Sequence, residues 1–268
     1  MTTLKQIITV IIAIIVLFTS RYIYQPIINR LPLTEEVAFD TAYILAAITT
    51  MVVIYILHKK LTPLQLRISR QCNHETTIYE LVAIFIIMKF FSMVIVVVGT
   101  YIDNELITAG NITTEFSTMG AIDILFLVIS SSIVAPIIEE IIFRGTLLNA
   151  LGRVMSVKGA VLVSSVVFGL LHRTSVATVV TATVLGVVLA CIYLANRNLL
   201  NSMVVHGLYN FLALFLSYKA QVIDPWLSEA VGFGVGSAVV VFGGMVVYVA
   251  VCVITYEKLK GKYKLIGF

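Results

Sequence analysis

Long runs of apolar residues, separated by short polar stretches, dominate this chain of 268 residues. Polar and apolar residues do not alternate within the runs, so the pattern predicts helices rather than strands. A run of about 20 apolar residues is long enough to cross a hydrocarbon core of about 30 Å. We therefore predict an all-α, polytopic membrane protein with eight transmembrane helices, at 5–24, 38–57, 80–102, 120–143, 155–172, 175–195, 199–218 and 230–255.

The composition supports this class. Hydrophobic residues make up 60% of the chain and charged residues only 12%, about half of what a soluble domain carries. We expect one membrane domain over residues 1–268, in which the first apolar run is an uncleaved helix. The net charge of +4 is explained by topology and by anionic lipid headgroups, so we expect no nucleic-acid partner.

The distribution of lysine and arginine predicts the orientation. With eight helices, four of these residues fall on the side opposite the termini: Arg21, Arg30, Arg173 and Lys219. Lys89 lies within a span, and thirteen others share the side of the termini: Lys5, Lys59, Lys60, Arg67, Arg70, Arg144, Arg153, Lys158, Arg197, Lys258, Lys260, Lys262 and Lys264. The cytoplasmic face carries the excess, so we predict that both termini are cytoplasmic.

The fourth run ends with two adjacent acids in the sequence APIIEEIIFRG. Glu140 and Arg144 are four residues apart, so they share a helix face and are expected to pair. Glu139 is rotated by about 100° from its neighbour and must point elsewhere. Pro136, three residues earlier, favours a kink, and a kink beside an unpaired acid indicates a cavity.

Two later runs each contain a histidine with a partner four residues away. The first ends in FGLLH, which places Phe168 and His172 on one face, and the second contains HGLYN, with His206 and Asn210. An acid, two imidazoles and an amide suit the activation of water and the stabilisation of an oxyanion. Two histidines and a glutamate also suit zinc. Taken singly, each residue has an ordinary structural role as an interfacial group, a packing ring or an interhelical hydrogen bond.

The ordered motifs EExxxR, FxxxH and HxxxN resemble those of the CPBP family, the CAAX protease and bacteriocin-processing (Abi) group of intramembrane proteases. The resemblance covers residues 120–218. It implies an endopeptidase of a membrane-anchored, lipidated or amphipathic peptide or lipoprotein, of the bacterial kind and therefore in a bacterial cell membrane. It further implies that Glu139 is the general base, that His172 polarises the water, and that His206 and Asn210 form the oxyanion hole. Glu140 and Arg144 would support the site.

The resemblance leaves the metal question open. We expect no cofactor, because the sequence shows no recognisable second shell; a zinc-dependent site would use Glu139, His172 and His206. Two other classes remain: a non-proteolytic membrane partner, such as a bacteriocin immunity protein or a sensor regulator, and a small transporter. The absence of an inverted repeat disfavours transport.

The predicted boundaries raise a geometric problem. If the fourth helix ends near residue 145, Glu139 lies about 10 Å below the cytoplasmic face, and His206 lies at a similar depth. His172 would lie about 20 Å deep by the same rise per residue. A shared site therefore requires the fifth helix to begin above the membrane or to tilt, or the segment HRTS to be buried in a cavity.

Overall fold

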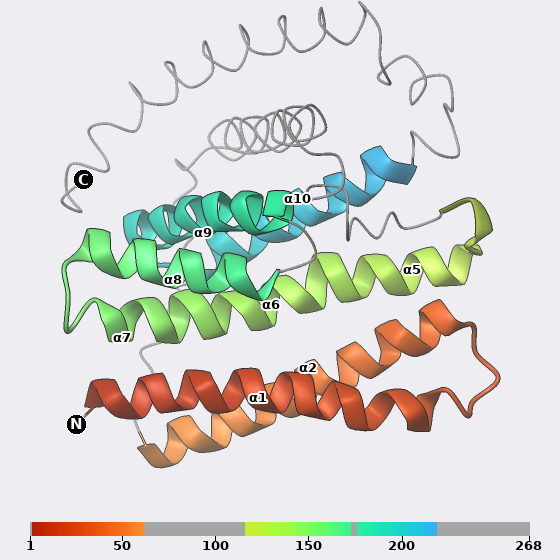
Figure 1. The fold of residues 1–268 in the computed structure, drawn as a ribbon, viewed down its shortest axis with the longest axis horizontal. Helices are drawn as coiled ribbons and strands as arrows, with labels where there is room; N and C mark the ends of the chain where they lie inside the picture. Colours follow the sequence, from red (N-terminus) through yellow and green to blue (C-terminus); the bar gives the residue numbers. More distant parts are fainter. Residues whose placement is uncertain (1, 62–115, 173–175, 219–268) are drawn as a thin grey trace, which may run out of the picture.

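The computed structural model describes residues 2–61, 116–172 and 176–218, and these residues form helices with no strand among them (Figure 1). Four helices are long and apolar enough to cross a membrane: Thr3–Ile28, Glu35–Leu57, Ala121–Leu151 and Thr178–Ala195. Two further apolar helices, Val157–Leu171 and Leu199–Phe215, are shorter. The all-α membrane class is therefore confirmed. The predicted helices at 80–102 and 230–255 lie outside the described residues, so the number of eight stays a prediction.

The first two helices, α1 (Thr2–Ile28) and α2 (Glu35–Leu61), form an antiparallel hairpin (Figure 1). Small residues line their contact, and Ala13, Ala42 and Ala46 are almost fully buried. Small side chains let two helix backbones approach closely within a bilayer. Thr34 caps α2 by accepting a hydrogen bond from the Val37 amide.

One long helical rod follows and carries the acid pair. It consists of α5 (Ala121–Ile129), η2 (Ser130–Val134), α6 (Ala135–Glu140), η3 (Ile141–Leu148) and α7 (Asn149–Leu151). The segments η2 and η3 are π-helical, and such segments are frequent at functional sites. Pro136 is the second residue of α6, just after η2. The change from π- to α-helical hydrogen bonding there accommodates a residue that has no backbone N–H. The predicted end at residue 143 was wrong, because the rod continues to Leu151.

Three more helices complete the described fold: α8 (Val157–Leu171), α9 (Val176–Asn196) and α10 (Leu199–Tyr218). Ser156 caps α8 through a bond from the Gly159 amide. In Figure 1 the rod α5–α7 runs between the α1–α2 hairpin and the group formed by α8, α9 and α10. The acid pair is thus at the centre of the described part of the molecule.

Candidate active site

Three helices bring one acid and two histidines together. Glu139 lies on α6, His172 directly follows the last residue of α8, and His206 lies on α10. The Glu139 Oε2 atom is 3.9 Å from His172 Nε2 and 3.7 Å from His206 Nε2. The side chains of Glu139, His172 and His206 are 18%, 35% and 2% exposed, respectively. The side chains that the motifs predicted to meet therefore lie together.

Both distances are too long for direct hydrogen bonds, which weaken steeply beyond about 3.5 Å. Polar groups at such a separation are commonly bridged by water. Both Nε2 atoms lie within 4 Å of the same carboxylate oxygen, so a water bound to that oxygen would be close to the imidazoles. The spacing therefore suits the capture of a single water beside Glu139.

The second acid points away from Glu139, as the helical geometry predicted. Its Oε1 atom accepts a hydrogen bond of 2.6 Å from Arg144 Nη1, and neither side chain has more than a few per cent of its surface exposed. Arg144 Nη2 also donates to the backbone carbonyl of Gly186 on α9, at 3.1 Å. Glu140 and Arg144 thus form a buried ion pair that joins the rod to α9.

The hydrogen bonds of the two rings determine which nitrogen faces Glu139. Nδ1 of His172 is 2.8 Å from the Phe168 carbonyl oxygen, and Nδ1 of His206 is 3.1 Å from Glu140 Oε1. A carbonyl oxygen and an ionised carboxylate only accept, so both Nδ1 atoms carry hydrogen and donate. The Nε2 atom of each ring is consequently the one that is directed at Glu139.

Phe168 holds the two histidines in place. It is 1% exposed, and its ring centroid lies 4.5 Å from that of His172 and 5.8 Å from that of His206. The guanidinium carbon of Arg144 lies 4.7 Å from the same ring centroid. Phe168 therefore packs against both histidines and the cation of the ion pair.

Asn210 is placed differently from the other motif residues. Its amide nitrogen donates to the backbone carbonyl of Ser131 in η2, at 2.8 Å. Ser131 precedes Glu139 by eight residues, or about 12 Å along a helix. Asn210 thus ties α10 to the π-helical segment, and it retains one amide hydrogen beyond this bond.

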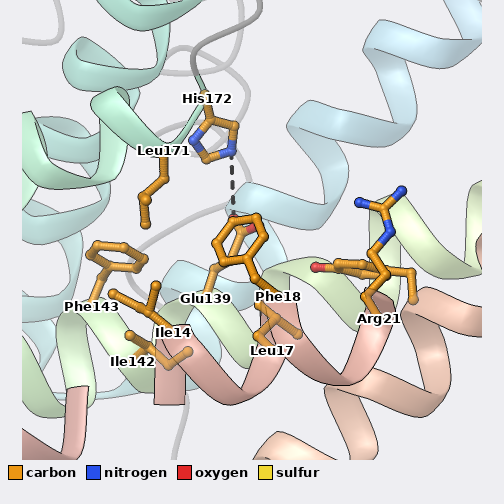
Figure 2. Close-up of a pocket in the computed structure, with 10 residues that line it drawn as sticks. Ile14, Leu17, Phe18, Arg21, Glu139, Ile142, Phe143, Leu171 and His172 are labelled. Carbon is orange, nitrogen blue, oxygen red and sulfur yellow. Dashed lines mark ion pairs between the residues drawn. The ribbon is translucent and has the colours of Figure 1, made fainter. Parts of the chain in front are cut away.

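A cavity of about 90 Å³ opens beside Glu139 and His172 (Figure 2). It has room for several water molecules. Its lining comes from α1, α2, the rod and α8, and consists of Ile14, Leu17, Phe18, Arg21, Tyr43, Glu139, Ile142, Phe143, Leu171 and His172. The lining residues from α1 and α2 belong to no motif, so the sequence analysis did not assign them to the site. The charge of Arg21 within an apolar run is the one sequence signal among them.

Comparison with protein families gives a match to part of the chain. Residues 121–212 match the family model described as type II CAAX prenyl endopeptidase Rce1-like. The matched residues are called the Rce1-like segment below. The resemblance to CAAX proteases inferred from the three motifs is thereby confirmed, and the match includes Glu139, His172, His206 and Asn210. No curated protein and no solved structure matches the chain.

The sequence-based helix ends placed Glu139 and His172 at different depths in the membrane, and the length of the rod removes this difference. Because the rod ends at Leu151, Glu139 lies 12 residues, or about 18 Å, from its end. His172 lies 15 residues after Val157, at a similar depth of about 22 Å. In the α9–α10 turn Asn198 and Leu199 are buried while Arg197 is exposed, and His206 reaches Glu139 from the eighth residue of α10.

The sequence analysis found no second-shell partners for a metal site, and the structure corrects this point. Both histidines have second-shell partners, the Phe168 carbonyl and Glu140, which the sequence did not reveal. Within residues 2–61, 116–172 and 176–218, however, no group of three histidine, cysteine, aspartate or glutamate side chains has the arrangement of a metal site. The expectation of no cofactor therefore stays a prediction, and we derive no step through a zinc ion.

Proposed function

We propose that this integral membrane protein is an intramembrane endopeptidase in which Glu139 activates the attacking water. The observation that carries the proposal is the convergence of Glu139 Oε2 with the Nε2 atoms of two histidines, at 3.7 and 3.9 Å, beside a cavity with room for water. The Rce1-like family match supports peptide-bond hydrolysis by this segment. It gives no support to a non-proteolytic partner.

The proposed reaction uses general acid–base catalysis. Glu139 takes a proton from the water while the water oxygen bonds to the scissile carbonyl carbon. His172 orients that water through Nε2. The carbonyl oxygen becomes an oxyanion. Glu139 then delivers its proton to the leaving amine as the C–N bond breaks, which restores the carboxylate.

We assign stabilisation of the oxyanion to His206 and Asn210. His206 directs Nε2 toward the reacting centre, and an Nε2–H group there donates to the developing charge. Asn210 contributes the amide hydrogen that is not bonded to Ser131. Glu140 fixes the His206 ring, and Arg144 balances the charge of Glu140.

The proposed substrate is a lipidated or amphipathic peptide, or a lipoprotein, held at the membrane. This choice rests on the family match and on the apolar lining of the cavity beside Glu139. The start of α1 and the α7–α8 turn lie at the same end of the described helices (Figure 1), and Lys5, Arg153 and Lys158 are near it. We propose that this end is cytoplasmic, with both termini there, in a bacterial cell membrane.

The test is proteolysis by the purified protein in liposomes. A panel of lipidated and amphipathic peptides is incubated with the wild type, with Glu139→Ala and with Glu36→Ala, which removes an exposed acid at the start of α2. We expect new peptide termini, detected by mass spectrometry, with the wild type and Glu36→Ala alone. Equal cleavage by Glu139→Ala, or no cleavage of any peptide by the wild type, would overturn the proposal.

A further inference from the structure

Arg21 is a charged residue in the last third of an apolar membrane span, Thr3–Ile28. A cation within a bilayer is costly, and such residues commonly mark a functional site. Its guanidinium carbon lies 3.9 Å from the ring centroid of Phe39 and 5.7 Å from that of Tyr43, both on α2. Arg21 makes no ion pair with any residue that the structure describes.

The sequence-based count assigned Arg21 to the side opposite the termini. The structure places it in the lining of the cavity that contains Glu139 and His172. In Figure 2, Arg21 lies at one end of the group, Phe143 and Leu171 lie toward the other, and Glu139 lies between them, next to Phe18. The cavity therefore has a cationic end, a reactive centre and an apolar end.

Asp40 attracts Arg21 electrostatically, but neither Asp40 nor Glu139 forms an ion pair with it. Asp40 on α2 accepts a hydrogen bond of 2.6 Å from Ser130 Oγ, and Glu139 faces the two histidines. The remaining lining is apolar except for Tyr43. A guanidinium in such surroundings presents several N–H donors that match the two oxygens of a carboxylate.

We propose that Arg21 binds a carboxylate of the substrate peptide and so determines which peptides are cleaved, an inference that rests on the proposed function. The carboxylate belongs to the C-terminus or to an acidic side chain close to the scissile bond. An apolar side chain of the same peptide would pack against Phe143 and Leu171. Because Arg21 lies outside residues 121–212, this specificity is supplied by α1 and not by the Rce1-like segment.

The test is a binding measurement with the Glu139→Gln protein, which leaves the peptide intact. Three fluorescent forms of a peptide from the panel are compared: one with a free C-terminal carboxylate, the same peptide with a C-terminal amide, and the amide with aspartate as its last residue. A charge-assisted contact predicts that the free acid binds about tenfold or more tightly than the amide. The aspartate peptide distinguishes the two sources, since it binds like the free acid only if a side chain suffices.

The Arg21→Gln change, made in the Glu139→Gln protein, should remove the preference and leave affinity for the amide unchanged. Arg21→Lys keeps the charge and should retain part of the preference. Arg30→Gln, at an exposed position beyond the end of α1, is the matched control and should retain all of it. Equal binding of the acid and amide peptides, or a preference that survives Arg21→Gln, would overturn the inference.

Cleavage by the wild type separates this inference from the proposed function. A preference for the acid that depends on Arg21, without cleavage of any peptide, would contradict the protease and leave the carboxylate site in place. Cleavage of the acid and amide peptides with equal efficiency would support the protease and reject the role of Arg21. The comparison of acid with amide needs no change at Arg21, so it remains decisive even if Arg21→Gln does not fold.

Discussion

His206 lies between the two adjacent acids and contacts both. Its Nδ1 atom is 3.1 Å from Glu140 Oε1, and its Nε2 atom is 3.7 Å from Glu139 Oε2. The two glutamates therefore act on opposite sides of one ring. This arrangement divides the pair into an acid that faces the cavity and an acid that maintains the structure, and the two are expected to respond differently to substitution.

Glu140→Gln should destabilise the protein more than Glu139→Gln does. The substitution leaves the buried guanidinium of Arg144 without its counter-charge, and breaking a buried ion pair costs about 3–5 kcal/mol. Glu139 has no such partner, so Glu139→Gln should leave the thermal midpoint in detergent almost unchanged while abolishing cleavage. Glu36→Gln, at an exposed acid, is the control. A larger loss of stability with Glu139→Gln would contradict this division.

Phe168→Leu should lower the rate of cleavage while the protein still folds. The smaller side chain loses the ring that contacts both histidines, so neither imidazole is held firmly against Glu139. Phe168→Ala should in addition cost about 3–5 kcal/mol of stability through the cavity that it creates. Phe215→Leu is the matched control, because that ring is exposed. Unchanged kinetics in Phe168→Leu, measured beside the control, would show that the ring does not position the histidines.

Gly207→Ala should displace α10 and reduce activity. A Cβ atom at this position would lie 2.5 Å from the backbone carbonyl oxygen of Ser132, so one of the two helices must move. His206 is the preceding residue and would move with α10. Gly159→Ala is the control, since its Cβ atom would meet only the ends of the Ser156 and Met155 side chains. Wild-type activity in Gly207→Ala would contradict the close approach of α10 to η2.

Cleavage should persist after treatment with a strong chelator. The proposed reaction runs through the Glu139 carboxylate and contains no step that a metal ion performs. The measurement is the rate before and after chelation and dialysis, together with elemental analysis of the purified protein. A loss of activity that stoichiometric zinc restores would reject the metal-free reaction.

Local spacing predicted several contacts of the site correctly. Four residues make one helical turn, which is why the Glu140–Arg144 pair and the Phe168–His172 contact were visible in the sequence. The ordered motifs also predicted that three helices would meet. These contacts depend on helix geometry alone or on a pattern that the Rce1-like family shares.

Contacts that depend on helix type and on distant packing could not be predicted. The π-helical segments have no clear sequence signal, so neither the bond from Asn210 to Ser131 nor the length of the rod was foreseen. The position of Arg21 depends on how α1 packs against the rod. Periodicity identifies α1 as a helix but gives no information about the helix that it contacts.

The central claim is that Glu139 and His172 act on one water. The most direct test is a double-mutant cycle of cleavage rates with Glu139→Gln, His172→Ala and both changes together. Groups that act as a unit give strongly non-additive effects, so the double variant should be about as slow as Glu139→Gln alone. If the two losses instead multiply, the side chains contribute independently, and a shared water is wrong.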